Sequence, residues 1–126
     1  MAAKLELENY EKTQFPYNIG KATFVDGESK SADFDTKNIP LNLAIFNEGT
    51  VTLKAADLAT TPTLNVNIVA KDHKTGDWRI VASFTKRTTN GSETIRLTDL
   101  TRAIAIDATL SGGSFTITIT GEFFRK

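Results

Sequence analysis

The chain's single histidine and single tryptophan lie close together in the segment "KDHKTGDW", residues 71–78. Two carboxylates, from Asp72 and Asp77, flank the imidazole of His73, and these groups can bind cations. Calcium takes about six to eight oxygen ligands, and a single imidazole does not hold a transition metal tightly without partners. The segment supplies too few ligands. We therefore predict no metal site and no cofactor, and interpret it as a turn closed at Gly76, with a weak cation site as the alternative.

The residue types used in catalysis are present, but their pattern does not favour an enzyme. The chain has no cysteine, so nucleophilic catalysis would need His73 as base, and His73 lies in the predicted surface turn. The segment "SGGS", residues 111–114, has neither a G-x-S-x-G elbow nor the lysine and helix of a phosphate loop. Instead of forming a buried carboxylate pair, the acids fall at predicted strand ends or turns: Glu48, Asp57, Asp72, Asp77, Glu93 and Asp99. We expect no catalytic residue and no enzymatic activity.

Trp78 allows two interpretations. We favour a core anchor at the start of a strand, because a tryptophan ring has a large apolar surface to bury. The alternative is an exposed platform for sugar rings, to which Tyr10 and Tyr17 could contribute although both lie far away in the sequence.

These residues must be positioned by β-strands, because apolar residues recur at every second position. In residues 113–123, "GSFTITITGEF", three apolar residues alternate with threonines, which gives a strand one apolar and one hydroxylated face. The apolar face of residues 78–85 is expected to consist of Trp78, Ile80, Ala82 and Phe84. Further strands are predicted at residues 21–25, 31–36, 40–47, 50–55, 63–71, 93–97 and 102–110.

The threonine face of residues 113–123 has three candidate roles. We favour a solvated sheet face. Contact with another protein is the first alternative, because ordering threonine side chains costs little conformational entropy. Ice binding is the second, but it needs regular threonine ladders across several strands, and this strand alone shows the pattern clearly.

Turns that contain glycine separate the predicted strands. They lie at residues 25–29, 47–50, 73–77, 88–93 and 111–113. Within them, "NEG", "TNG" and "SGG" are typical of hairpins. One sheet of so many amphipathic strands would leave its apolar face in water, so two sheets must face each other. We predict an all-β fold: a two-sheet antiparallel β-sandwich, jelly-roll-like, with an extended N-terminal arm.

The arm comprises residues 1–16 and the β-sandwich domain residues 17–126. The arm is interpreted either as a frayed terminus or a strand packed on its own domain, or as a segment that docks on a neighbouring subunit. At the other end, the adjacent residues 123 and 124 are both phenylalanine and point to opposite faces of a strand, so one of them could lie at a subunit interface. The predicted interface residues are Leu5, Leu7, Tyr10, Phe15, Tyr17 and Phe124.

Charge and hydropathy limit the class of partner. Lysine plus arginine and aspartate plus glutamate each number 15, so the formal net charge is zero. A nucleic-acid binder or a protein held on anionic lipid would carry a basic excess. The chain has no signal-peptide pattern and no apolar stretch of membrane-spanning length. We expect no nucleic acid or membrane partner, and a soluble protein made in a cytoplasm.

About half of the chain, residues 62–123, carries a family resemblance. The succession of "PTLNVNIVAKDHKTGDWRIVASFT", "ETIRL" and "TRAIAIDATLSGGSFTITITGEF" resembles the small β-sandwich virion proteins of tailed bacteriophages. This resemblance implies a capsid decoration, or cement, protein that binds the major capsid protein or another virion protein. It also implies a virion location after synthesis in the host cytoplasm, and a homo-oligomer with a trimer favoured. A carbohydrate- or surface-binding module of a head or tail fibre is the alternative.

Overall fold

A computed structural model describes residues 3–8, 19–72, 74–98, 100 and 103–125. The elements are β1 (Lys4–Glu8), β2 (Ile19–Lys30), β3 (Phe34–Asp35), β4 (Glu48–Lys71), β5 (Trp78–Ser83), β6 (Gly91–Leu97) and β7 (Ile104–Phe124). Every pairing between them is antiparallel. The all-β sandwich prediction is confirmed. None of the described residues belongs to a helix that could cross a membrane.

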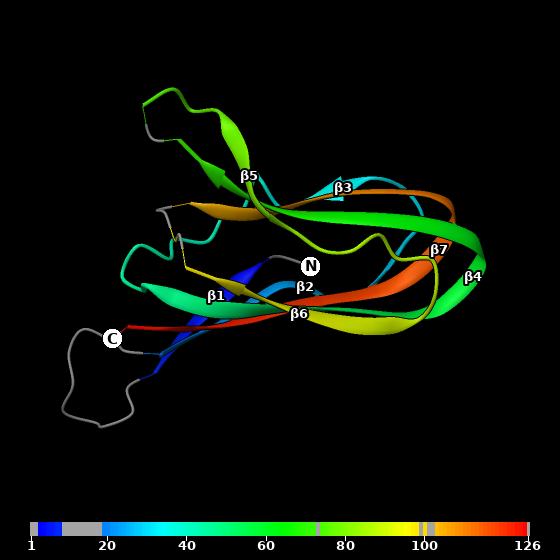
Figure 1. The fold of residues 1–126 in the computed structure, drawn as a ribbon, viewed down its shortest axis with the longest axis horizontal. Helices are drawn as coiled ribbons and strands as arrows, with labels where there is room; N and C mark the ends of the chain where they lie inside the picture. Colours follow the sequence, from blue (N-terminus) through cyan, green and yellow to red (C-terminus); the bar gives the residue numbers. More distant parts are fainter. Residues whose placement is uncertain (1–2, 9–18, 73, 99, 101–102, 126) are drawn as a thin grey trace.

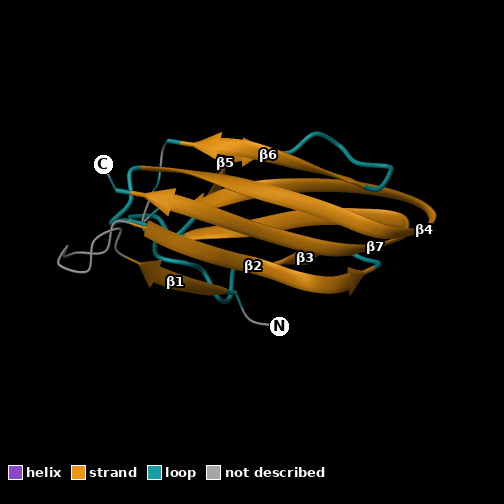
Figure 2. Cartoon of the chain, turned by 90° about the horizontal axis from the view of Figure 1, so that it is seen from below, coloured by secondary structure: helices purple, strands orange, loops and turns teal. Residues whose placement is uncertain are grey.

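Two long strands, β4 and β7, build both layers of the sandwich. They pair along almost their whole length, from Glu48 opposite Phe124 to Ala70 opposite Ile104, and both bend back near the middle (Figure 1). One half of each strand forms the first layer, with the order β1-β2-β7-β4-β6. The other half forms the second layer, with the order β3-β7-β4-β5. The two faces of the sandwich are therefore parts of one curled sheet that folds over on itself (Figure 2).

The hairpin turn predicted at residues 111–113 is wrong, because β7 continues through these residues and bends there together with β4. Gly112 has a φ of 81° and Thr60 on the facing strand has a φ of 68°, so both residues leave the extended conformation there. A Cβ on Gly113 would lie 2.2 Å from the carbonyl oxygen of Ala59, so glycine lets the two backbones approach. The ladder continues beyond the bend. The "SGG" signal therefore marks a bend inside one strand and not a hairpin.

Three other predicted turns have different outcomes. Residues 25–29 form a β-bulge inside β2, where the register shifts between Val25 and Glu28 and Gly27 has a φ of 60°. Residues 47–50 open β4 instead of closing a hairpin. Residues 88–93 lead into β6, but β5 and β6 each pair with β4 and not with each other.

The alternation predicted along the strands holds in the core. Phe115, Ile117 and Ile119 are at most 1% exposed and point inward, whereas the threonines between them point outward. The prediction of a strand at residues 40–47 is wrong. There the Asn42 side chain accepts a hydrogen bond from the backbone N–H of Ala44, and this local turn breaks the alternation, so that Ile45 is 40% exposed.

Glycines make room for aromatic rings at one end of the core. Phe123 on β7 is fully buried and lies opposite Gly20 of β2 and Gly49 of β4. A Cβ on Gly49 would lie 2.2 Å from Cδ1 of Phe123, and a Cβ on Gly20 would lie 2.5 Å from Cζ of Phe46. The centroids of the two phenylalanine rings are 6.3 Å apart. Both rings therefore occupy space that any larger residue at these glycines would fill.

Candidate functional site

Residues 71–72 and 74–78 belong to the hairpin between β4 and β5. The N–H of Asp72 donates to the carbonyl of Asp77 at 2.8 Å, and the N–H of Gly76 donates to the carbonyl of Asp72 at 2.8 Å. The Asp72 carboxylate accepts the N–H groups of Lys74 and Thr75 at 2.7 and 3.2 Å, so it serves the turn itself. His73 lies outside the described residues, and among those described no group of three or more His, Cys, Asp or Glu residues could hold a metal ion.

Trp78 lies on the outer face of the second layer, so the core-anchor interpretation is wrong. It sits opposite the exposed Lys71, whose Nζ is 5.9 Å from the centroid of the indole ring. The expected common face of Trp78, Ile80, Ala82 and Phe84 is also wrong, because a bulge inserts one extra residue between Ile80 and Ala82. Ile80 therefore points outward with 60% of its surface exposed, while Phe84 is buried.

The interface role predicted for Leu5, Leu7, Tyr10, Phe15, Tyr17 and Phe124 stays a prediction. Leu5 on β1 packs against the core, and its neighbour Leu7 is 39% exposed. Phe124 is partly buried at the end of β7, where its carbonyl accepts the N–H of Asn47 at 3.1 Å. Tyr10, Phe15 and Tyr17 lie outside the described residues. β1 itself pairs with β2 of the same chain.

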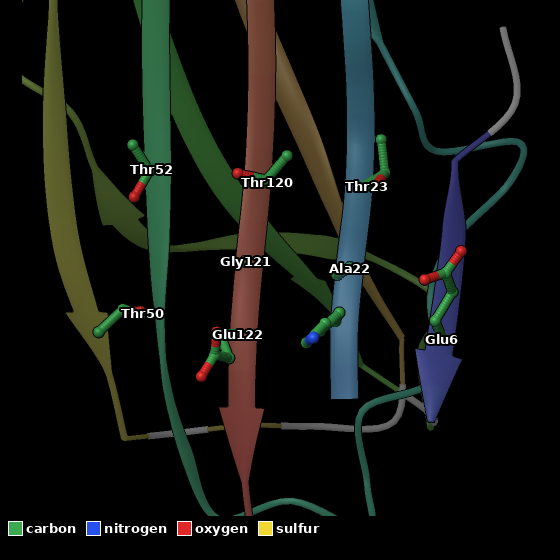
Figure 3. A pocket seen from close by; sticks show the side chains of 9 residues that line it. Glu6, Ala22, Thr23, Thr50, Thr52, Thr120, Gly121 and Glu122 are labelled. Atoms are coloured by element: carbon green, nitrogen blue, oxygen red, sulfur yellow. The ribbon is translucent and has the colours of Figure 1, made fainter. Parts of the chain in front are cut away.

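The outer face of the first layer carries a row of threonines across four strands. Registers between neighbouring strands place Thr23 beside Thr120, Thr120 beside Thr52, and Thr52 beside Thr94. Figure 3 shows Thr23, Thr120 and Thr52 side by side on β2, β7 and β4. The hydroxyl oxygens of Thr52 and Thr94 are 2.8 Å apart and share a hydrogen bond. We call this set the threonine row.

A second row of polar side chains runs beside the threonine row. It consists of Glu6, Lys21, Glu122, Thr50 and Arg96, each opposite the next on a neighbouring strand. We call this set the charged row. The two rows bound a shallow groove of about 420 Å³ (Figure 3). Its lining is Glu6, Lys21, Ala22, Thr23, Thr50, Thr52, Thr120, Gly121 and Glu122.

The charges of the charged row differ in their partners. A carboxylate oxygen of Glu6 forms an ion pair with Nζ of Lys4 at 3.4 Å, and the guanidinium group of Arg96 forms one with the carboxylate of Glu48 at 2.9 Å. Lys21 is likewise engaged in an interaction of its own. Within the described residues, the carboxylate of Glu122 forms no ion pair or hydrogen bond. Glu122 is exposed on the outer face of the first layer.

The groove was not predicted from the sequence. The alternation in residues 113–123 identifies Thr120 as outward-facing, and the same argument applies to Thr52 within residues 50–55. What alternation cannot supply is the register that sets these two residues side by side with Thr23 and Thr94. The registers bring together one threonine from each of four strands, which alternation within a single strand does not reveal.

No protein-family model matches the chain, and no curated protein matches it. Among solved structures, it is similar over 96% of its length to the glycosylation-associated protein (Gap123) complex of Streptococcus agalactiae, with 10% identity and a TM-score of 0.47. The CBM22-1–GH10 modules of xylanase 10B of Clostridium thermocellum, complexed with xylohexaose, give 98% coverage, 13% identity and a TM-score of 0.49. A CBM4 structure gives 95% coverage, 18% identity and a TM-score of 0.45.

The chain spans about a quarter of the length of the first two of these structures, 24% and 25%, and 73% of the third. At identities and TM-scores this low, the likenesses carry no information on the ligand or partner of this chain.

Proposed function

We propose that the protein is a non-enzymatic carbohydrate-binding β-sandwich module whose ligand lies in the groove on the first layer. The observation that carries this proposal is the chemistry of the groove, which combines a row of threonine hydroxyls with two carboxylates and one ammonium group. Sugar hydroxyls both donate and accept hydrogen bonds. Threonine hydroxyls complement them in both roles, and carboxylates accept from them.

Other classes of ligand fit the groove less well. Apolar small molecules are bound in concave sites lined mainly by hydrophobic and aromatic side chains. Protein partners usually bury an apolar centre rich in aromatic residues. Of the nine lining residues, Ala22 and Gly121 are the non-polar ones, and neither offers a large apolar surface. A hydroxyl-rich polymer, which gains from many hydrogen bonds at modest burial, is the ligand class that this surface complements.

The exposure of the groove supports a binding role without catalysis. Glycoside hydrolysis needs two carboxylates, one of them in an environment that keeps it protonated. Glu6 and Glu122 are both exposed on the outer face of the sheet, and Lys21 lies between them in the register. Such groups hold a ligand by hydrogen bonds and charge rather than by proton transfer.

The test is to remove groove hydroxyls without changing the shape of the sheet. In Thr52→Val/Thr120→Val, two hydroxyls become methyl groups and the β-branched shape is kept. Glycan-array screening of the wild type identifies a ligand. Calorimetry should then show that the double variant binds it about five- to 150-fold more weakly, at about 0.5–1.5 kcal/mol for each of the two lost hydrogen bonds.

Thr109→Val is the matched control. Thr109 is an exposed threonine of the same strand, β7, but it lies in the half of that strand that belongs to the second layer. This variant should bind the glycan like the wild type. Undiminished affinity in Thr52→Val/Thr120→Val, or no glycan ligand at all, would contradict the proposal.

The capsid-decoration role stays a prediction. Its trimeric state, its virion location and its capsid partner rest on the sequence resemblance alone. Binding of the purified protein to empty phage capsids that survives in Thr52→Val/Thr120→Val would favour decoration over glycan recognition.

A further inference from the structure

We infer that the groove selects a glycan that carries protonated primary amines, such as a chain of glucosamine units, over its N-acetylated or acidic counterparts. This inference rests on the proposed function, because it concerns the same groove. It names the class of sugar that the charged row recognises.

The first argument is the balance of charge among the groove residues. The charged side chains of the lining are Glu6, Lys21 and Glu122, so two carboxylates face one ammonium group within the lining, and Lys4, outside it, pairs with Glu6. In the register, Lys21 lies opposite Glu6 on one side and opposite Glu122 on the other. An acidic sugar approaching Lys21 would therefore meet a carboxylate on either side, and like charges at this range repel.

The second argument is that the carboxylate of Glu122 is available to pair with a cationic group of the ligand. Glu6 already binds Lys4, and Lys21 is engaged, whereas Glu122 has no ion pair or hydrogen bond within the described part of the chain. A cationic group of the ligand can therefore pair with Glu122 without breaking a contact of the free protein. An amide of an N-acetylated sugar is neutral and offers one N–H donor in place of that charge.

The third argument is the set of acceptors around Glu122. Thr50 lies opposite Glu122 on β4, and Thr120 lies two residues before it on the same face of β7 (Figure 3). A primary ammonium has three N–H donors and no acceptor. One carboxylate and two neighbouring hydroxyl oxygens supply acceptors for such a group. A neutral hydroxyl ligand would not use the charge of the carboxylate.

The test compares three oligosaccharides of equal length by calorimetry: a glucosamine oligomer, its N-acetylated form and an oligogalacturonate. The pH is chosen so that the glucosamine amine is protonated and the carboxylates are ionised. The wild type should bind the glucosamine oligomer about two- to fivefold more tightly than the N-acetylated oligomer, which corresponds to an exposed ion pair. This preference should shrink as salt is added. Because the net charge of the protein is zero, general attraction of a polycation contributes little.

Glu122→Gln is the decisive variant and Asp77→Asn its control. Glu122→Gln keeps the size of the side chain, so it should remove the preference for the amine: the affinities for the glucosamine oligomer and the N-acetylated oligomer should become equal. Asp77 is an exposed residue of the β4–β5 hairpin and does not line the groove, so Asp77→Asn should keep the preference.

The outcomes separate this inference from the proposed function. Equal or tighter binding of the N-acetylated or acidic oligomer by the wild type would overturn the inference and leave glycan binding intact. An amine preference that persists in Glu122→Gln would overturn it as well. Absence of binding to all three oligomers and to a glycan array would defeat the inference and the proposed function together.

Discussion

Replacing Gly49 by alanine should destabilise the fold strongly, although alanine normally favours folding over glycine. Where the backbone can accept it, Gly→Ala stabilises a protein by about 0.4–1 kcal/mol through the unfolded state. At Gly49, however, the new Cβ would lie 2.2 Å from Cδ1 of Phe123 and 2.7 Å from the carbonyl oxygen of Glu122. Two competing effects therefore act on the same substitution.

The steric effect should win because neither neighbour can move freely. Phe123 is fully buried, and its ring also lies over Gly121, where a Cβ would be 2.8 Å from it. The carbonyl of Glu122 belongs to the β4–β7 ladder. Overpacking of this kind costs about 1–3 kcal/mol, and we expect the upper end, about 3 kcal/mol. With about 2.1 cal/mol/K of unfolding entropy for each of the 126 residues, this loss lowers Tm by about 11 °C.

Urea unfolding followed by circular dichroism, with calorimetry for Tm, measures the effect. A double-mutant cycle with Phe123→Val locates its cause, because valine lacks the ring atoms that the new methyl group would meet. Gly49→Ala should cost clearly less in the Phe123→Val background than in the wild type. The reasoning would be refuted by a Gly49→Ala protein as stable as the wild type, or by a cycle without coupling.

Two further predictions concern the bend and the β2 bulge. Thr60 is β-branched and has a φ of 68°, so Thr60→Gly should raise the unfolding free energy by about 1 kcal/mol. The neighbouring Thr61 lies outside the positive-φ region, so Thr61→Gly should lower the unfolding free energy instead. Urea unfolding of both variants measures the two effects. At the bulge, burial raises the pKa of the Glu28 carboxyl, but the Lys30 ammonium group 3.2 Å away contributes to holding it below its ordinary value of 4.5. The stability that this ion pair gives is present above that pH and is lost as the pH falls through the lowered pKa. Lys30→Gln should therefore raise the pKa of Glu28 in an NMR titration, and its stability deficit against the wild type should disappear in acid. An unchanged pKa of Glu28, or a deficit that persists in acid, would contradict this.

The sequence predicts the inward faces of the strands well because alternation is a local property. Phe115, Ile117 and Ile119 are inward wherever the strand lies, since successive side chains of an extended chain point to opposite sides. The same rule failed at Trp78, because one extra residue in a bulge reverses the alternation. It failed again at residues 40–47, where a side-chain hydrogen bond of Asn42 makes a turn inside an apparently alternating segment. Both failures depend on contacts that the one-dimensional pattern does not contain.

Local sequence signals cannot distinguish a strand that bends from a chain that reverses direction in a hairpin. Gly112 and Gly113 have the same turn chemistry in a hairpin as in a strand that bends over its partner. The outcome depends on β4, some 50 residues earlier in the chain, which bends at Thr60 opposite Gly113 and continues the ladder. The two predicted hairpin strands at 102–110 and 113–123 are consequently one strand, β7, that passes through both layers.

The groove and the core are coupled because they alternate along the same strands. Thr120 and Glu122 face the groove, while Ile119 and Phe123 beside them face the interior. A shift of β7 by one residue would exchange these two sets, so the packing of Phe123 against its glycines fixes which groups the outer face presents. Phe123 is thus a positioning residue for the groove although it cannot touch a ligand there. Substitutions that disturb it should weaken glycan binding together with stability, whereas Glu122→Gln should affect binding alone.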